Sequence, residues 1–299
     1  MPLKKDIERK RGNRFGFWFF HTAVRIFGLS GAYGLLYFVA VYYLVLDRAA
    51  VGASMAYVRR RFPLHGRLRR LFDVYLLFVN QGRSLIDRYY VLAGGQDIQI
   101  DIVGMDRLRE MLGKSRGLIL LTAHVGNWQV ALTALRRLGK TVHLLMRRED
   151  NPAVRASLNI GSEGDAVRIL YTDDALGGVI EAMKAIEGGD LISIMGDRAY
   201  DFSALEAPLL GGTVRFPYGA FTIAAAAQCP VVVLLSAKTG TKRYVVDVSK
   251  VIDPPIGRRE EKQERIQECV ARFAGILQEY AVEHPYQWFV FRDMWKSNR

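Results

Sequence analysis

A histidine that follows a short apolar run is the residue best placed to do chemistry in this chain. The run 118–122, LILLT, is followed by His124 and then by Gly126, Asn127 and Gln129. Open α/β sheets build sites in this way, with a buried strand that ends in a reactive side chain and leads into a helix. Imidazole is well suited to take a proton from a hydroxyl group near neutral pH. The pattern favours His124 as a general base, and a structural histidine at a strand end is the alternative.

Strand-like and helix-like segments alternate from residue 98 onward. The predicted strands are 98–103, 118–122, 142–146, 167–171, 191–195, 231–236 and 244–248, and the predicted helices are 106–112, 127–138, 152–161, 178–187, 219–227 and 258–283. This alternation predicts an α/β fold with a mixed, mostly parallel sheet covered by helices on both faces. No repeat or low-complexity linker interrupts the pattern, so residues 71–299 are predicted to form a single domain.

Residues 1–70 carry almost all of the basic excess. The 299-residue chain has a formal net charge of +12, and its first 70 residues contain 14 Lys or Arg but only three acidic residues. Residues 26–46 have no charge, a length that could just cross a hydrocarbon core of ~30 Å at ~1.5 Å per residue. Both flanks are basic, so the positive-inside rule selects no orientation.

We therefore predict that residues 1–70 are a membrane-attachment region, an apolar helix or hairpin that enters one leaflet and is retained by anionic head groups. A single span and a buried core helix are the alternatives. Residues 57–70 are predicted to be a basic connector, and residues 67–93 a long amphipathic helix.

Several function classes are disfavoured by what the sequence lacks. It has no G-x-S-x-G nucleophile elbow and no G-x-G-x-x-G dinucleotide motif, which argues against a serine hydrolase and a Rossmann dehydrogenase. The basic residues flank an apolar run, which argues against a nucleic-acid partner. Cys229 and Cys269 lie in unrelated contexts, and no Cys/His ligand spacing is present. We therefore expect a reducing compartment, no metal and no cofactor.

Polar side chains follow the ends of several predicted strands. Asp197 and Arg198 come directly after 191–195, and a segment at 209–219, predicted to be a loop, precedes a helix. Guanidinium groups pair with phosphate through two hydrogen bonds. The candidates for substrate phosphate binding are Arg147, Arg148, Arg198 and Arg215. Surface charge, or salt bridges to nearby carboxylates, is the alternative role of these arginines.

Five segments, in order, resemble the motifs of the lipid A biosynthesis branch of the lysophospholipid acyltransferase superfamily. The segment HVGNWQ at 124–129 is similar to the family's H-x-G-N-W-E. The other four are RREDNP at 147–152, GDR at 196–198, LLG…G at 209–219 and QWFVFRDMW at 287–295. They resemble the family's Arg…Asn-Pro block, its acidic strand-end block, its F-F-G…G segment and its C-terminal Q-W-F…W. The resemblance covers nearly the whole chain.

The resemblance implies a glycerol-3-phosphate acyltransferase-like fold at the cytoplasmic face of the bacterial inner membrane. It implies transfer of a fatty acyl chain from acyl carrier protein or coenzyme A to a hydroxyl of a lipid acceptor. His124 would be the base in that reaction, with Asn127 and Trp128 beside it in substrate binding.

Gln129 departs from the family motif, which has a carboxylate at this position. An amide oxygen can orient an imidazole ring, but it cannot stabilise the imidazolium by charge. Asp197 could supply that charge, or Gln129 could suffice in a slower enzyme. The third alternative is a catalytically weakened or silent membrane-associated lipid-binding homologue.

Overall fold

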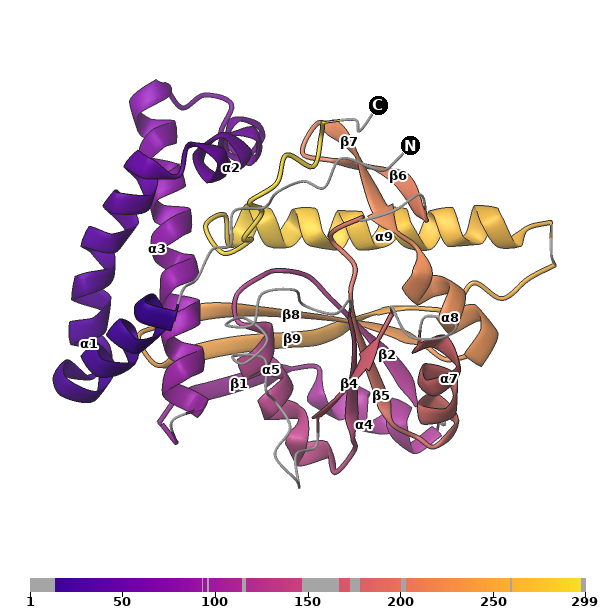
Figure 1. Ribbon diagram of the computed structural model, residues 1–299. Coiled ribbons are helices and arrows are strands. Elements are labelled where there is room, and N and C mark those ends of the chain that lie inside the picture. Colours follow the sequence, from indigo (N-terminus) through magenta and orange to yellow (C-terminus); the bar gives the residue numbers. More distant parts are fainter. Residues whose placement is uncertain are drawn as a thin grey trace.

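Seven strands form one sheet in a computed structural model that describes residues 14–92, 94–95, 97–114, 117–146, 167–172, 178–199, 203–258 and 260–296. The order of the strands is β1-β9-β8-β2-β5-β3-β4 (Figure 1). Their bounds are β1 Gln99–Val103, β2 Leu118–Thr122, β3 Val142–Met146, β4 Val167–Tyr171, β5 Leu191–Met195, β8 Val231–Gly240 and β9 Arg243–Ile252. All neighbouring pairs are parallel except β8 and β9. The predicted mostly parallel sheet is confirmed, and the predicted helix at 152–161 lies outside the described residues.

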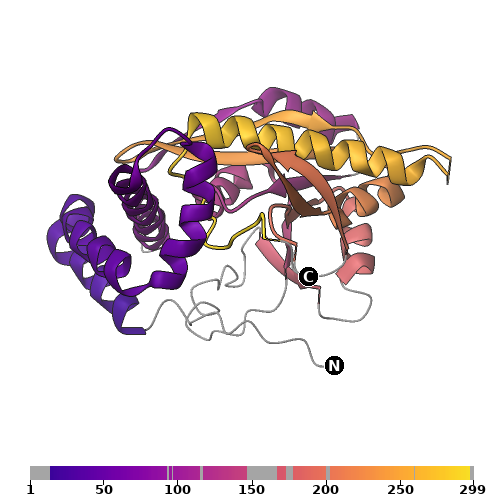
Figure 2. The ribbon, with the colours of Figure 1, turned by 90° about the horizontal axis from the view of Figure 1, so that it is seen from above.

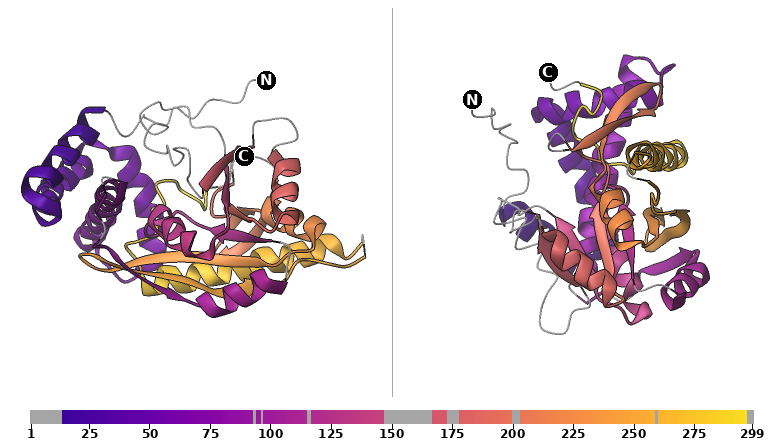
Figure 3. Two further views of the ribbon diagram at one scale, coloured as in Figure 1. Left: turned by 90° about the horizontal axis from the view of Figure 1, so that it is seen from below. Right: turned by 90° about the vertical axis from the view of Figure 1, so that its right-hand side faces the viewer.

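Successive residues of β2 face two different apolar layers. Ile119 and Leu121 pack in a cluster with residues of α7 (Val179–Glu187), α8 (Gly219–Ala227) and α9 (Lys262–Glu283). Leu118 and Leu120 pack with α4 (Met105–Lys114), α5 (Trp128–Ala134) and the 3₁₀ turn η1 (Leu135–Leu138). All five residues of β2 are buried, as expected for a parallel strand between two helical layers. Figures 1 and 3 show α9 running beside the long β8–β9 pair.

A two-stranded hairpin forms where the sequence predicted a loop. Strands β6 (Ala204–Leu209) and β7 (Gly212–Pro217) are antiparallel, and β6 packs against α9. The two residues between them, Leu210 and Gly211, have φ angles of 48° and 73°, which fits the primed turns that connect hairpin strands. The loop prediction for 209–219 is therefore wrong over most of its length.

Three N-terminal helices lie together at one end of the molecule, beside the sheet (Figure 2). They are α1 (Arg14–Leu46), α2 (Arg48–Arg61) and α3 (Arg67–Leu92). Helix α1 has non-helical geometry at Gly28, and its inner face packs along α3 through an apolar cluster that includes Leu36 and Ile86. Residues 57–61 form the last turn of α2, so the connector predicted at 57–70 is shorter than expected. The proposed domain boundary at residue 70 falls in the first turn of α3.

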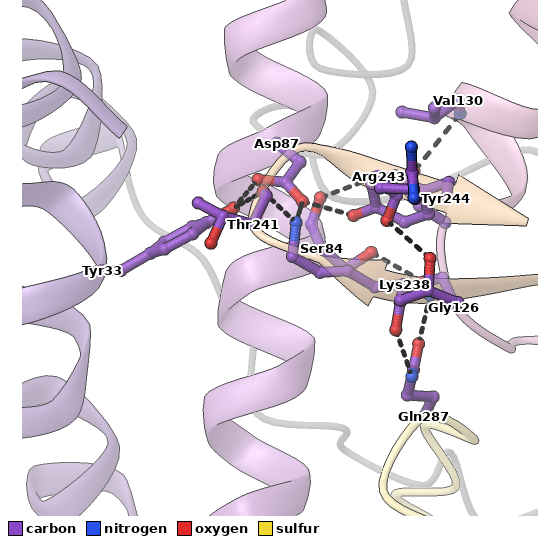
Figure 4. A network of polar contacts seen from close by, with 12 residues as sticks. Tyr33, Ser84, Asp87, Gly126, Val130, Lys238, Thr241, Arg243, Tyr244 and Gln287 are labelled. Atoms are coloured by element: carbon purple, nitrogen blue, oxygen red, sulfur yellow. Dashed lines mark hydrogen bonds and ion pairs between the residues drawn. The ribbon is translucent and has the colours of Figure 1, made fainter. Parts of the chain in front are cut away.

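A buried ionic cluster ties these helices to the sheet. Asp87 of α3 has no exposed surface and lies 2.6 Å from the Nζ of Lys238 on β8. The hydroxyl groups of Tyr33 on α1 and Tyr244 on β9 also donate to this carboxylate (Figure 4). Lys238 Nζ donates further to the Thr241 carbonyl oxygen at 2.6 Å. One carboxylate therefore joins α1, α3 and the β8–β9 pair.

Asp87→Asn should lower the free energy of unfolding by about 3–5 kcal/mol, because it removes the charge of a buried ion pair and leaves the Lys238 ammonium uncompensated. Chemical denaturation of the purified protein measures this. Asp106→Asn is the matched control, since its side chain is 99% exposed, and it should change the value by no more than about 0.5 kcal/mol. Equal effects of the two substitutions would contradict the structural role of the cluster.

Candidate active site

His124 and Asp197 lie side by side because the two strands that precede them are paired. In the parallel β2–β5 pair, Thr122 is opposite Met195. Each of these paired residues is followed two positions later by one of the polar side chains. The Gly196 N–H donates to the Thr122 carbonyl oxygen at 2.8 Å, which extends the pairing beyond the strand ends. The register of the sheet thus positions the histidine beside the carboxylate.

Asp197 accepts three hydrogen bonds, two of them from His124. The imidazole Nδ1 lies 2.7 Å from Oδ1, the His124 backbone N–H donates to Oδ2 at 3.0 Å, and the Trp288 indole N–H donates to Oδ2 at 3.1 Å. Complete burial acts to raise the pKa of Asp197. Its interactions with His124 and Arg198 outweigh burial and lower the pKa below the usual range. The carboxylate is therefore ionised and in contact with Nδ1, which leaves Nε2 of His124 to interact with a substrate.

The C-terminal QWF segment braces the loop that carries His124. Val125 and Trp288 form an antiparallel bridge, and the Phe289 N–H donates to the His124 carbonyl oxygen at 2.9 Å. The fully buried Trp288 ring packs edge-on against Tyr57 of α2, with 5.4 Å between the ring centroids. The indole that contacts Asp197 is thus fixed by an N-terminal helix.

The turn after His124 is tied to α3 and β8. Asn127 caps α5 by accepting the Val130 N–H at 3.3 Å, and its Nδ2 donates to the Ser84 carbonyl oxygen at 2.9 Å. Its backbone N–H donates to the Ser236 hydroxyl at 2.9 Å. Gly126 has a φ of 51°, and a Cβ there would lie 1.8 Å from the Ser236 carbonyl oxygen. Only glycine fits this close approach.

A cavity of about 270 Å³ opens beside the histidine. Helix α3 forms one wall, the 287–295 segment forms another, and the turn after β2 forms the base. The lining residues are Gln81, Ser84, Leu85, Arg88, His124, Gly126, Asn127, Trp128, Gln129, Arg198, Phe289, Phe291 and Arg292. The His124 side chain is 24% exposed. The cavity lining therefore includes three arginines and His124, whose imidazole contacts the buried Asp197 carboxylate behind it.

The predicted site residues separate into three groups. His124, Asn127, Trp128, Gln129 and Arg198 line the cavity, with Asp197 directly behind His124. Arg215 lies outside the cavity, on an exposed position of β7 opposite Glu206 of β6. Arg147 and Arg148 lie outside the described residues. Gln129 does not contact the imidazole through its oxygen, which instead accepts a hydrogen bond from Arg88 Nη1 at 2.6 Å.

The cavity and support residues that were not predicted from the sequence include Trp288, Arg292 and Arg88. Trp288 and Arg292 lie in the 287–295 motif, which was a signal for this part of the site. Arg88 is one of several basic residues on an amphipathic helix, and no sequence signal distinguishes it from the others. Among the described residues, no group of three or more His, Cys, Asp or Glu side chains could hold a metal ion.

The sheet is mostly parallel, and a histidine–carboxylate pair lies beside a cavity at the ends of its strands. This arrangement is typical of proteins whose site is suited to general-base chemistry. Residues 95–297 match the family model of the bacterial lipid A biosynthesis acyltransferases. Because the match spans more than half of the chain, the protein belongs to this family and to the lipid acyltransferases.

Other comparisons add little to this assignment. No curated protein sequence matches the chain. Among solved structures, the 1-acyl-sn-glycerophosphate acyltransferase PlsC from Thermotoga maritima is 16% identical, with a TM-score of 0.37. That match covers 85% of this chain and 96% of the other. The assignment therefore depends on the family model.

Gly126→Ala should lower the free energy of unfolding by more than about 2 kcal/mol, because the added methyl group would overlap the Ser236 carbonyl and the backbone has a positive φ. Thermal and denaturant unfolding measure the change. Gly113→Ala in α4 is the control, because a Cβ there meets nothing within 4 Å. It should be neutral or stabilising by up to about 1 kcal/mol. A Gly126→Ala protein as stable as the control would show that the turn is not constrained.

Proposed function

We propose that this protein is a membrane-associated O-acyltransferase that moves a fatty acyl chain from a thioester donor, acyl carrier protein or acyl-CoA, to a hydroxyl of a lipid acceptor. The observation that carries the proposal is the 2.7 Å contact between His124 Nδ1 and the buried carboxylate of Asp197 at the cavity. Family membership supports acyl transfer to a lipid, with a lipid A precursor as the first acceptor to test. The contact favours an enzyme over a silent lipid-binding homologue.

The reaction needs one base and no external energy source. His124 Nε2 takes the proton of the acceptor hydroxyl, and the oxygen attacks the thioester carbonyl carbon. The tetrahedral intermediate collapses with cleavage of the C–S bond, and His124 returns the proton to the leaving thiolate. The Asp197 carboxylate stabilises the imidazolium between these two steps, as a buried carboxylate does in hydrolase triads. The products are an ester and a free thiol.

In this proposal, three further cavity residues bind the substrates. Arg198 has a guanidinium suited to a phosphate of either substrate, and Trp128 and Asn127 form the cavity base beside the histidine. We retain Arg147 and Arg148 as proposed phosphate ligands. We do not assign a substrate to Arg215, because it lies away from the cavity. No nucleic acid, metal or cofactor enters the proposed reaction.

His124→Ala should abolish acyl transfer, and Asp197→Asn should lower kcat by up to about 10⁴-fold, the effect of removing the equivalent charge in a Ser-His-Asp triad. Thiol release from an acyl thioester in the presence of lipid acceptors, with mass spectrometry of the lipid product, measures both variants.

A second histidine–aspartate pair supplies the matched control. His143 Nε2 lies 3.0 Å from Asp190 Oδ2, and neither residue lines the cavity. Asp190→Asn should keep a kcat within a few-fold of the wild type. Full activity in His124→Ala would exclude the proposed mechanism, and full activity in Asp197→Asn would exclude Asp197 from the charge role.

The outer face of the N-terminal helices supports attachment to a bilayer. Residues 18–46 of α1 are long and apolar enough to cross a membrane, with a mean hydropathy of 1.7, and only 28% of the most apolar stretch is buried. The large exposed apolar residues of this region are Trp18, Ile26, Phe27, Tyr37, Phe38, Val41, Tyr42, Tyr43, Val45, Leu46, Leu64, Leu68, Leu71 and Phe72. Arginines 59, 60, 61, 67, 69 and 70 lie among or beside the last four of these.

This arrangement fits monotopic attachment better than a full span. The helix after Gly28 is only about 27 Å long, and its inner face is already covered by α3. Apolar side chains in the acyl region and arginines at anionic head groups would retain residues 1–70 at the surface. We propose the cytoplasmic face of the bacterial inner membrane as the location, where both kinds of thioester donor are available.

Phe38→Glu should weaken binding to vesicles of anionic phospholipid at least about tenfold, because burying a phenylalanine side chain contributes ~1.5–3 kcal/mol. Phe38 is 78% exposed on α1. The control is Ile256→Glu, because Ile256 is 52% exposed. It belongs to the segment between β9 and α9, and Figure 1 shows that segment at the end of the molecule opposite α1. Sedimentation with vesicles at low and high salt measures both. Equal binding of the two variants would exclude α1 as the attachment surface.

A further inference from the structure

The oxygen of the Gln129 side-chain amide accepts a hydrogen bond, whereas its nitrogen donates none to the described residues. The residue lies on the first turn of α5, lines the cavity with His124 and is 8% exposed. Its Oε1 accepts a hydrogen bond from Arg88 Nη1 at 2.6 Å. A guanidinium can only donate, so Gln129 must present its oxygen to Arg88 and direct its two N–H groups elsewhere. Among the described residues, Gln129 Nε2 donates no hydrogen bond.

The side-chain oxygen of Gln129 therefore does not accept a hydrogen bond from the His124 imidazole, as a residue that supports the base would. The Nδ1 of His124 contacts Asp197, and the only acceptor oxygen of the Gln129 side chain contacts Arg88. The carboxylate that contacts the imidazole lies instead at the end of the neighbouring strand, β5. This leaves position 129 with a neutral hydrogen-bond donor in the wall of the same cavity.

The charges around the cavity favour an anion. Among the described residues that line it, three are arginines, Arg88, Arg198 and Arg292, and none is acidic. A glutamate at position 129 would neutralise Arg88 and place a negative charge beside the reacting groups. Glutamine instead preserves the positive charge of Arg88 and adds an N–H donor of its own.

We propose that Gln129 Nε2 donates a hydrogen bond to the oxyanion of the tetrahedral intermediate, with Arg88 fixing the orientation of the amide. The proposal rests on the acyltransferase function proposed above. As the acceptor oxygen bonds to the thioester carbonyl carbon, the C=O π electrons move onto the carbonyl oxygen. The Gln129 N–H stabilises this charge until the C–S bond breaks and the carbonyl re-forms. A preoriented donor of this kind acts on the transition state more than on the bound substrate.

The decisive variant is Gln129→Glu, since base support and oxyanion stabilisation predict opposite results for it. If residue 129 supported His124, a carboxylate should raise kcat. With Gln129 as the oxyanion donor, Gln129→Glu should lower kcat by about 10²–10³-fold, the usual effect of losing one oxyanion donor, with KM changed by only a few-fold. Gln129→Met, which keeps the length but has no donor, should lower kcat to a similar extent. The assay uses full-length protein, an acyl thioester and a lysophospholipid acceptor in mixed micelles.

Gln263→Glu is the matched control, because Gln263 lies on an exposed position of α9 and does not line the cavity. It makes the same substitution away from the cavity, and its kcat should stay within a few-fold of the wild type. Melting temperature and vesicle binding are measured for every variant. A Gln129→Glu or folded Gln129→Met protein with wild-type kcat would overturn the proposal, as would equal kcat losses in Gln129→Glu and Gln263→Glu.

The same assay separates this inference from the function on which it rests. Activity in the wild type, loss in His124→Ala and retention in both Gln129 variants would remove the oxyanion role and leave the acyltransferase proposal intact. Full activity in His124→Ala would remove both.

Discussion

Two neighbouring parallel strands, β2 and β5, bring His124 and Asp197 into contact, and the rest of the site is built around that contact. The carboxylate is fully buried and remains ionised because it accepts N–H groups from the His124 backbone, the imidazole and the Trp288 indole. A buried charge with fewer partners would be neutralised instead. A parallel pair also requires cover on both faces, which explains the two apolar layers around β2.

The sheet alone does not complete the site. Residues of α3 and of the 287–295 segment, about 200 positions apart in the chain, form the two walls of the cavity. The turn at Gly126 and Asn127 joins them through hydrogen bonds to Ser84, Ser236 and the Gln287 carbonyl oxygen. The loop that carries His124 thus depends on long-range contacts for its shape, and its own sequence sets only the glycine and the helix cap.

Much of the sheet was predictable because apolar runs bounded by turn residues are a local signal. The predicted strands at 118–122, 142–146, 167–171 and 191–195 match the structure, and the strand ends correctly pointed to His124 and Asp197 as neighbours. The β6–β7 hairpin was not predicted, because Pro208, Gly211 and Gly212 are of residue types that are typical of loops. Arg88 could not be found, since periodicity shows which face of a helix is apolar and not which basic residue reaches a distant glutamine.

Two adjacent residues of α3 link the N-terminal helices to the candidate active site. Asp87 joins α3 to α1 and to the β8–β9 pair through Tyr33, Lys238 and Tyr244, and Arg88 contacts Gln129 in the cavity. Helix α1 therefore presents its exposed apolar face at a fixed position relative to His124. If that face lies in a leaflet, the bilayer surface has a defined place beside the cavity wall. An acceptor lipid could then offer its hydroxyl to His124 while its acyl chains remain in the membrane, which removes the need for a cavity large enough to enclose them.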